Sequence, residues 1–108
     1  MGFNIQIRSN KTDKTIHYAA FIGDKIVSKL YVVLYGEDGT CIWGFLTVPE
    51  YRNKGIGSAL LNYVVKKHKP ISLFVSDINE KKLLSFYKKH GFFICGNGYN
   101  GHKKMIHI

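Results

Sequence analysis

The feature that most constrains the fold is a change of hydrophobic period near the middle of the chain. Residues 40–48, TCIWGFLTV, form a nearly continuous apolar run that is typical of a strand buried on both faces, and Pro49 ends it. From Ile56 onward, the apolar positions 56, 60, 61, 64 and 65 fall on one face of a helix. Between them stands the pattern R-x-x-G-x-G at residues 52–57. The sequence therefore predicts a strand, a glycine-rich turn and a helix.

The segments on either side predict a mixed α+β fold. Before this unit, three segments alternate in polarity or are rich in β-branched and aromatic residues, which is typical of strands joined by tight turns. After it, an apolar strand precedes a second helix, in which Asp77 and Glu80 resemble a capping box and Gly91 follows the last turn. The predicted order is ββββ-α-β-α-ββ within one domain of residues 1–108: strands at 3–8, 15–22, 25–35, 40–48, 71–76, 92–95 and 103–108, a helix at 56–69, and a helix marked by Leu83, Leu84 and Tyr87.

Composition excludes several classes of protein. The chain has no run of about 18 apolar residues that could span a membrane, and its N-terminal MGFNIQIRSNK lacks the apolar stretch of a secretory signal. Cys41 and Cys95 lie far apart, and although a disulfide stays open, two reduced thiols are the simpler interpretation. Two distant cysteines and five scattered histidines do not supply a metal site. We expect a cytoplasmic protein without a bound metal.

The positive charge is concentrated in the second half of the chain. Residues 52–108 hold eleven basic and two acidic side chains, whereas residues 1–51 hold five of each. Such a field attracts anions: a phosphorylated cofactor, a nucleic acid or an acidic partner. Nucleic-acid binding is the weaker prediction, because most aromatic residues fall within apolar strands rather than among the basic residues.

The glycine-rich turn is suited to hold a phosphate. The first amides of a helix have no partner within the helix, and glycines let the backbone approach an anion closely. Residues 53–58, NKGIGS, do not match the G-x-x-x-x-G-K-[ST] of a Walker loop. A dinucleotide fingerprint fits poorly, because Leu60 replaces the third glycine and six residues separate the strand from the glycines. The pyrophosphate of coenzyme A and a turn with no ligand are the other interpretations.

Two motifs resemble those of one family. VPEYRNKGIGSALL, residues 48–61, resembles motif A of the GNAT (Gcn5-related) N-acetyltransferases, and NEKKLLSFYKKHGF, residues 79–92, resembles their second signature. The resemblance covers roughly residues 26–96. It implies a GNAT-like fold, with a mixed and mostly antiparallel central sheet, two main helices and a splayed parallel strand pair. It also implies an acyltransferase that moves an acetyl group from acetyl-CoA to a primary amine.

The resemblance assigns the cofactor to main-chain groups of the chain. In this family the amides of the motif A turn bind the pyrophosphate, and the preceding strand offers backbone groups to pantetheine and the acetyl carbonyl. The spacing from Asn79 to Tyr87 is one residue longer than the family's, which puts the pantetheine contact of Asn79 in doubt. The implied cofactor-binding residues are Leu46, Thr47, Val48, Arg52, Asn53, Lys54, Gly55, Ile56, Gly57, Ser58 and Asn79.

The same resemblance implies a catalytic role for Tyr87. It matches the family tyrosine that protonates the departing thiolate after an amine attacks the thioester directly and forms a tetrahedral intermediate. A phenol, with an ordinary pKa of about 10, keeps that proton at neutral pH. The alternative is a tyrosine packed on an apolar helix face with Leu83 and Leu84. We name no general base, since His17 and His102 are isolated in the sequence.

The chain departs from the family on the acceptor side. The family places two helices between its first two strands, whereas only residues 9–14 stand there, so this is a short form. We expect an open acceptor side that suits a protruding protein lysine or N-terminus better than a small enclosed amine, and that a partner or a second subunit of a homodimer could complete. The alternative function is a non-catalytic module that binds CoA or nucleic acid on a degenerate GNAT fold.

Overall fold

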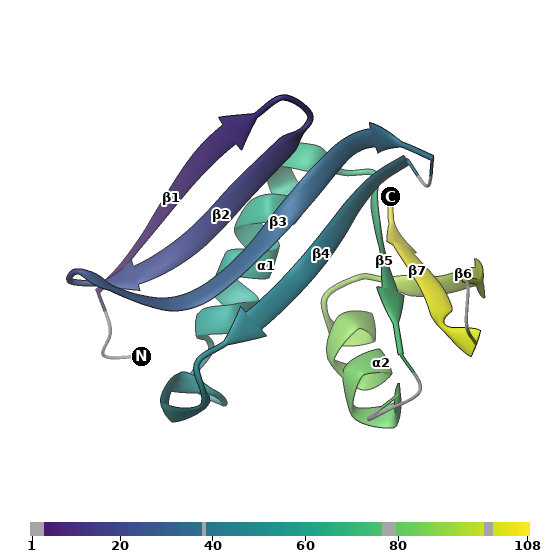
Figure 1. Ribbon diagram of the computed structural model, residues 1–108. Helices are drawn as coiled ribbons and strands as arrows, with labels where there is room; N and C mark the ends of the chain where they lie inside the picture. The colour runs from purple at the N-terminus through teal and green to yellow at the C-terminus, as the bar shows by residue number, and fades with distance from the viewer. Residues whose placement is uncertain (1–3, 38, 77–79, 99–100) are drawn as a thin grey trace.

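The elements follow the predicted order along the chain (Figure 1). The computed structural model describes residues 4–37, 39–76, 80–98 and 101–108, so Asn79 and the Asp77 part of the predicted capping box lie outside it. The elements are β1 (Ile5–Thr12), β2 (Thr15–Ile22), β3 (Lys25–Gly36), β4 (Gly39–Thr47), a short 3-10 helix (Pro49–Tyr51), α1 (Ile56–His68), β5 (Ile71–Val75), α2 (Glu80–Lys89), β6 (Phe93–Asn97) and β7 (Lys103–His107).

The strands within the described residues form a single sheet that is split near its centre. Its order is β1-β2-β3-β4-β5-β7-β6, and every neighbouring pair is antiparallel except β4 and β5. These two parallel strands pair at Cys41 and Ser72, where Ser72 Oγ also donates a hydrogen bond to the Thr40 carbonyl at 3.3 Å. Beyond that point they separate (Figure 1). This confirms the predicted mixed, mostly antiparallel sheet with a splayed parallel pair.

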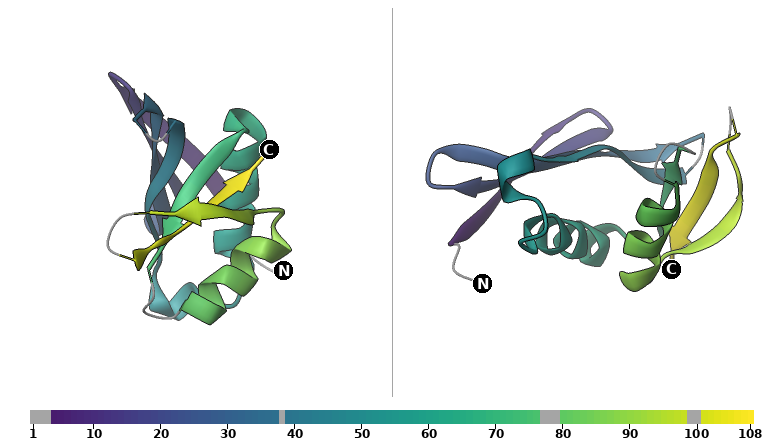
Figure 2. Two further views of the ribbon diagram at one scale, coloured as in Figure 1. Left: turned by 90° about the vertical axis from the view of Figure 1, so that its right-hand side faces the viewer. Right: turned by 90° about the horizontal axis from the view of Figure 1, so that it is seen from below.

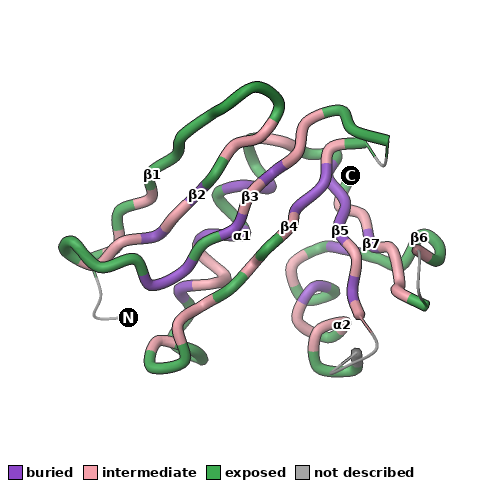
Figure 3. Tube along the Cα trace, viewed as in Figure 1, coloured by how far each residue is buried: buried purple, intermediate pink, exposed green. Residues whose placement is uncertain are grey.

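Both helices lie on one side of the layer formed by β1–β4 (Figure 2). The apolar stripe predicted for α1 is buried, and Leu60 and Leu61 reach the core that also contains Ile42 and Val32. α2 packs near β5 and adds the buried ring of Tyr87 to the same core. The buried positions in Figure 3 accordingly follow α1, β3, β5 and one side of α2. The described helices include none long and apolar enough to cross a membrane.

The opposite face of β1–β4, which we call the front face, carries no helix (Figure 2). β1 passes to β2 through the two residues Asp13 and Lys14, as the short form predicts, so the described chain has no helices there to cover the sheet. The open front face is therefore the main consequence of the short connection.

The two cysteines are not bonded to each other, and they differ in exposure: Cys41 is buried, whereas Cys95 is exposed on β6.

Candidate active site

The first turn of α1 is arranged to receive an anion. Gly55 precedes the helix with a left-handed φ of 81°, and Asn53 is also left-handed with φ 61°. No side chain caps the first amides of the helix, and its first turn contains no acidic residue. The Gly55 carbonyl accepts a hydrogen bond from the Ala59 amide at 3.0 Å, which closes the turn. The amides of the first turn and the positive end of the helix dipole are thus left for an external acceptor.

Close packing between β4 and α1 accounts for the second glycine of the motif. A Cβ on Gly57 would lie 3.0 Å from Thr47 Oγ1 and 3.5 Å from Phe45 Cζ. Thr47 Oγ1 has little room to move, because it lies 2.9 Å from Oγ of the buried Ser28 on β3. A larger residue at position 57 would push the helix away from the strand. Gly55 therefore allows the left-handed turn, and Gly57 allows α1 to approach β4 closely.

Arg52 stabilises the turn from within the chain. Its Nε donates a hydrogen bond to the Thr47 carbonyl at 3.0 Å, which ties the turn to the end of β4. Arg52 is otherwise exposed, so the rest of its guanidinium is open to solvent at the mouth of the site. A planar guanidinium can hold a carbonyl and an anionic oxygen at the same time, which a lysine could not do with the same geometry.

Hydrogen bonds at the end of β4 show which main-chain groups are already used. The Val48 amide donates to the Val27 carbonyl at 2.9 Å, and the Val48 carbonyl accepts from the Tyr51 amide at 2.9 Å. The Leu46 carbonyl accepts from Ser28 Oγ at 3.2 Å, on the β3 side. The main-chain groups of Leu46 and Val48 therefore face β3 or the turn.

The remaining groups of β4 face the gap toward β5. Successive residues of a strand direct their main-chain groups to opposite edges, so Phe45 and Thr47 point away from β3. We therefore correct the prediction for this strand: the main-chain groups of Leu46 and Val48 are used by β3 and the turn. The main-chain groups of Phe45 and the Thr47 amide point to the gap instead, while Arg52 holds the Thr47 carbonyl.

Most of the predicted site residues line one hollow of about 320 Å³ between β4, the turn and α2. Lys54 and Val48 do not line it, and Ile56 is buried in the core with only its main chain in the turn. The sequence analysis missed Phe45, although its alternation with Thr47 along one strand was a usable signal. The predicted residues that line the hollow are Leu46, Thr47, Arg52, Asn53, Gly55, Gly57, Ser58 and Tyr87, and those added by the structure are Phe45, Tyr51, Lys82, Leu83 and Phe86.

α2 brings Tyr87 into this hollow with a buried side chain, which is 8% exposed. Its ring packs among Phe86, Phe92 and Phe45, with centroid distances of 5.2, 5.7 and 6.5 Å. Burial among these rings raises the pKa of Tyr87 to about 12. The phenol therefore keeps its proton over the whole physiological range and is suited to donate a proton, not to accept one.

A second hollow, of about 250 Å³, shares Phe45, Leu83 and Tyr87 with the first. It runs along the β4–β5 gap, where the rings of Trp43 and Phe74 stack with centroids 5.4 Å apart. His102, just before β7, also lines it, and among the described lining residues His102 and Tyr87 are those with titratable side chains. Tyr87 thus stands between a hollow bordered by the glycine-rich turn and one bordered by aromatic rings and a histidine.

Known proteins share this fold. A GNAT-family acetyltransferase from Elizabethkingia anophelis with acetyl-CoA bound has 19% sequence identity and a TM-score of 0.75, and 95% of each chain is covered. The PaiA N-acetyltransferase from Thermoplasma acidophilum in complex with coenzyme A has 22% identity and a TM-score of 0.73, with 87% of this chain and 60% of that one covered. An acetyltransferase from Thermus thermophilus has 17% identity and a TM-score of 0.74, with 86% and 63% covered. The chain thus spans less than two thirds of the last two.

Sequence comparison agrees with the fold. A search of curated proteins gives no match. The model of the acetyltransferase (GNAT) domain matches residues 13–93, which is most of the chain and includes the glycine-rich turn and α2. The chain belongs to the GNAT acetyltransferase family.

Proposed function

We propose that the protein transfers an acetyl group from acetyl-CoA to a primary amine. The observation that carries this proposal is the uncapped first turn of α1, which borders the same hollow as Tyr87. Membership of the family supports an acyltransferase reaction. The coenzyme A and acetyl-CoA bound to two structural relatives support the choice of acyl donor.

The residues of the first hollow fit a diphosphate that is followed by an extended arm with amides. The first amides of α1 would bind the diphosphate, and Gly57 has no side chain to block it. Arg52 and Lys82 add positive charge among the lining residues. The main-chain groups of Phe45 and Thr47 face the β4–β5 gap, where they would pair with the amides of the arm. The cofactor would thus be held mainly by the backbone.

The second part of the proposal concerns proton transfer. Acetyl-CoA supplies an activated thioester when it is bound. The acceptor nitrogen would form a bond to the acyl carbon, the carbon–sulfur bond would break, and the Tyr87 hydroxyl would give its proton to the departing sulfur. The acylated nitrogen would lose its extra proton, and the Tyr87 phenolate would regain one, so that the proton count is restored. The rings around Tyr87 exclude water from this point and keep the phenol protonated.

We assign the other proton transfer to His102. The acceptor ammonium must lose a proton before its nitrogen attacks, and an imidazole is the side chain best suited to take a proton near neutral pH. His102 borders the second hollow together with Tyr87, whereas His17 lies on the front face of β2. Replacing His102 by glutamine should lower kcat/KM and remove the part of its pH dependence that comes from the imidazole. An unchanged pH profile would remove His102 from the mechanism.

Replacing Ser58 by aspartate tests the anion site without loss of the fold. Ser58 is in the first turn of α1 and lines the first hollow. A carboxylate there interacts favourably with the helix dipole, so the free energy of unfolding should stay the same or rise by about 0.3–1 kcal/mol. The same charge should repel the diphosphate and weaken acetyl-CoA binding at least about tenfold, or about 1.4 kcal/mol, in calorimetric titration. Ser58→Asn is the matched neutral control. Equal affinities for the two variants would contradict the proposed site.

A non-catalytic module is the alternative function, and turnover separates it from an enzyme. CoA release should be measured with lysine-bearing proteins, polyamines and amino sugars as acceptors. Acetyl-CoA binding without acetylation of any acceptor would favour the module. A nucleic-acid binder would instead show affinity for RNA or DNA that falls steeply with salt.

A further inference from the structure

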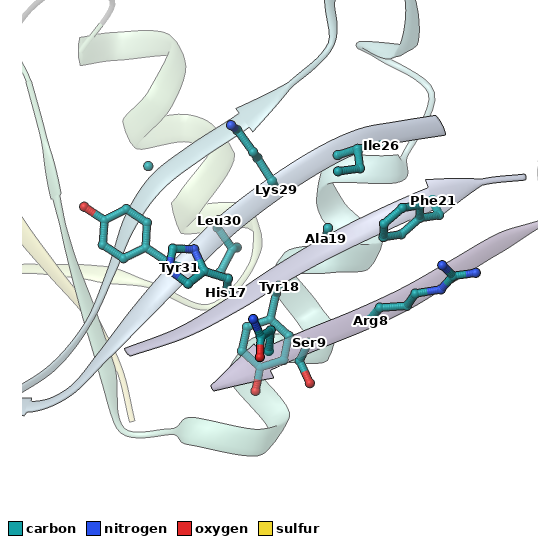
Figure 4. Close-up of a pocket in the computed structure, with 12 residues that line it drawn as sticks. Arg8, Ser9, His17, Tyr18, Ala19, Phe21, Ile26, Lys29, Leu30 and Tyr31 are labelled. Carbon is teal, nitrogen blue, oxygen red and sulfur yellow. The ribbon is translucent and has the colours of Figure 1, made fainter. Parts of the chain in front are cut away.

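The front face of β1–β4 holds a groove of about 570 Å³ (Figure 4). We call it the front groove. No helix covers it, and the proposed cofactor site does not account for it. The side chains that give it its chemical character are Arg8, His17, Phe21, Ile26, Lys29 and Tyr31.

The groove is basic and has no acidic counterpart. The strands β1, β2, β3 and β4 contain no aspartate or glutamate. Arg8 and Lys29 are exposed, and within the described part of the chain neither has a carboxylate at ion-pair distance. Arg8 donates instead to Gln6 Oε1 at 3.0 Å, and its guanidinium lies 4.5 Å from the Phe21 ring centroid. Two cations beside apolar side chains are thus available to an anionic partner.

The front groove adjoins the second hollow at one residue of β4. Gly44 of β4 lines both the groove and the second hollow, which Tyr87 also lines. Gly44 has φ 62°, and a Cβ there would lie 2.8 Å from Cε1 of Tyr31. A larger residue would therefore press on the Tyr31 ring where the groove and the second hollow adjoin. An acceptor held on the front face would have only this strand to pass on its way to Tyr87.

The shape and charge of the groove identify its occupant. A small amine would be poorly enclosed, because pockets for small molecules bury most of their ligand and no helix covers this face of the sheet (Figure 2). A second copy of the chain is unfavourable, since each copy carries a net charge of +9. A polypeptide can place carboxylates on Arg8 and Lys29 and apolar side chains on Phe21 and Ile26, while it carries a reactive amine.

We propose that the front groove binds an acidic polypeptide segment whose lysine or amino terminus is the acetyl acceptor. This inference rests on the proposed acetyl transfer and adds the class of acceptor to it. Arg8 and Lys29 bind carboxylates on either side of the acceptor residue. The acceptor amine passes by Gly44 to the hollow that Tyr87 and His102 line.

Three short synthetic peptides test the proposal. Each has one central lysine and a blocked amino terminus, and the flanking residues are Glu and Asp, Gln and Asn, or Arg. Binding is measured by fluorescence anisotropy, and acetylation by CoA release. The acidic peptide should exceed the neutral one about tenfold in kcat/KM at low salt, and the arginine peptide should be the poorest.

Charge reversal makes the test specific for the groove. The double variant Arg8→Glu with Lys29→Glu should invert the preference, so that the arginine peptide becomes the best acceptor, while acetyl-CoA affinity is unchanged. The control is Lys66→Glu with Lys69→Glu, the same charge change at exposed positions at the end of α1. This control should keep the preference for the acidic peptide.

Several results would overturn the proposal. Equal kcat/KM for the three peptides, or a preference that survives charge reversal, would overturn the proposed role of the groove. If small amines were still acetylated, the proposed acetyltransferase function would stand. RNA bound through Arg8 and Lys29 more tightly than the acidic peptide would assign the groove to nucleic acid. A dimer that charge reversal of these residues dissociates would assign it to a second copy. Failure of acetyl-CoA to bind in calorimetry would overturn the proposed function as well.

Discussion

The proton on Tyr87 can be tested through the stability of the protein, independently of any substrate. Burial raises the pKa of the Tyr87 phenol from 10.0 to about 12. The unfolded chain then loses this proton at lower pH than the folded chain. The stabilising effect is complete below pH 10 and is lost as the pH rises toward 12.

The size of the effect follows from the two pKa values. At pH 11 the phenol is mostly ionised in the unfolded chain and mostly protonated in the folded chain. This shifts the folding equilibrium about tenfold, which corresponds to about 1.4 kcal/mol of lost stability. Above pH 12 the loss would reach about 2.7 kcal/mol. Phenylalanine has no proton to lose, so the variant Tyr87→Phe lacks this pH-dependent contribution to stability. Relative to the variant, the wild type should therefore lose about 1.4 kcal/mol between pH 7 and pH 11.

Urea denaturation of both proteins at pH 7 and pH 11 measures this difference. Other groups titrate in the same range, but they are common to both proteins and cancel in the comparison. Tyr35→Phe is the control, because Tyr35 is 81% exposed and its hydroxyl stays in water in both states. If Tyr87→Phe shifted the stability equally at both pH values, the phenol would not be buried as described and the argument for a retained proton would fail.

The same variant should separate turnover from binding. If Tyr87 donates the proton to the leaving sulfur, Tyr87→Phe should lower kcat about 100-fold, which is within the range for general acids, and leave the acetyl-CoA Kd within about twofold. Stopped-flow measurement of the acyl-transfer step and calorimetric titration give the two quantities. An unchanged kcat would reduce Tyr87 to a packing residue of α2.

Two further predictions concern the sheet. Gly44→Ala should lower the free energy of unfolding by about 1–3 kcal/mol, because the new Cβ would lie 2.8 Å from the Tyr31 ring at a left-handed φ of 62°, and urea denaturation would show it. Nε2 of His68 lies 2.6 Å from the Tyr18 hydroxyl. The pKa of His68 is lowered below 6.5, mainly because the ring is partly buried and secondly because Lys67 is positively charged. Stability should therefore fall as the pH drops through and below 6.5, and His68→Gln should reduce that fall in thermal melts at pH 5 and 7.

The order of elements was predictable because its signals are local. The alternation of β2, the continuous apolar run of β4 and the helical stripe of α1 each lie within one short segment. The glycines at 55 and 57 gave the turn, since a left-handed cap and a close strand contact both require glycine. The short β1–β2 connection was equally local, because too few residues stand between the strands to form helices.

The orientation of β4 was not predictable from the same signals. Its register with β3 shifts between the pairs of Lys29 and Tyr31, so one extra residue of β4 stands opposite this part of β3. Which main-chain groups face the gap depends on that pairing and not on the residue types. For this reason the sequence analysis assigned backbone contacts to Leu46, Thr47 and Val48, whereas the hydrogen bonds turn the main-chain groups of Leu46 and Val48 to β3 and the turn.

His102 was missed for a different reason. It is distant in sequence from Tyr87, and the two share a hollow only because β7 lies between β5 and β6 in the sheet. A lone histidine in a glycine-rich turn gives no local sign of such a neighbour. The charge of the front groove was visible only in part, since strand alternation places Arg8 and Lys29 on one face but does not show that the face is bare.

The two sides of the site therefore differ in what a mutation changes. The proposed donor side depends on main-chain groups and on two glycines, so most side-chain replacements there should leave acetyl-CoA binding intact unless they add bulk or negative charge. The proposed acceptor side depends on exposed side chains of the front face, so replacements there should change which acceptor is used at little cost in stability. Such a division would let one chain keep its acyl donor while its acceptor preference changes, because the front groove and the first hollow share no lining residue.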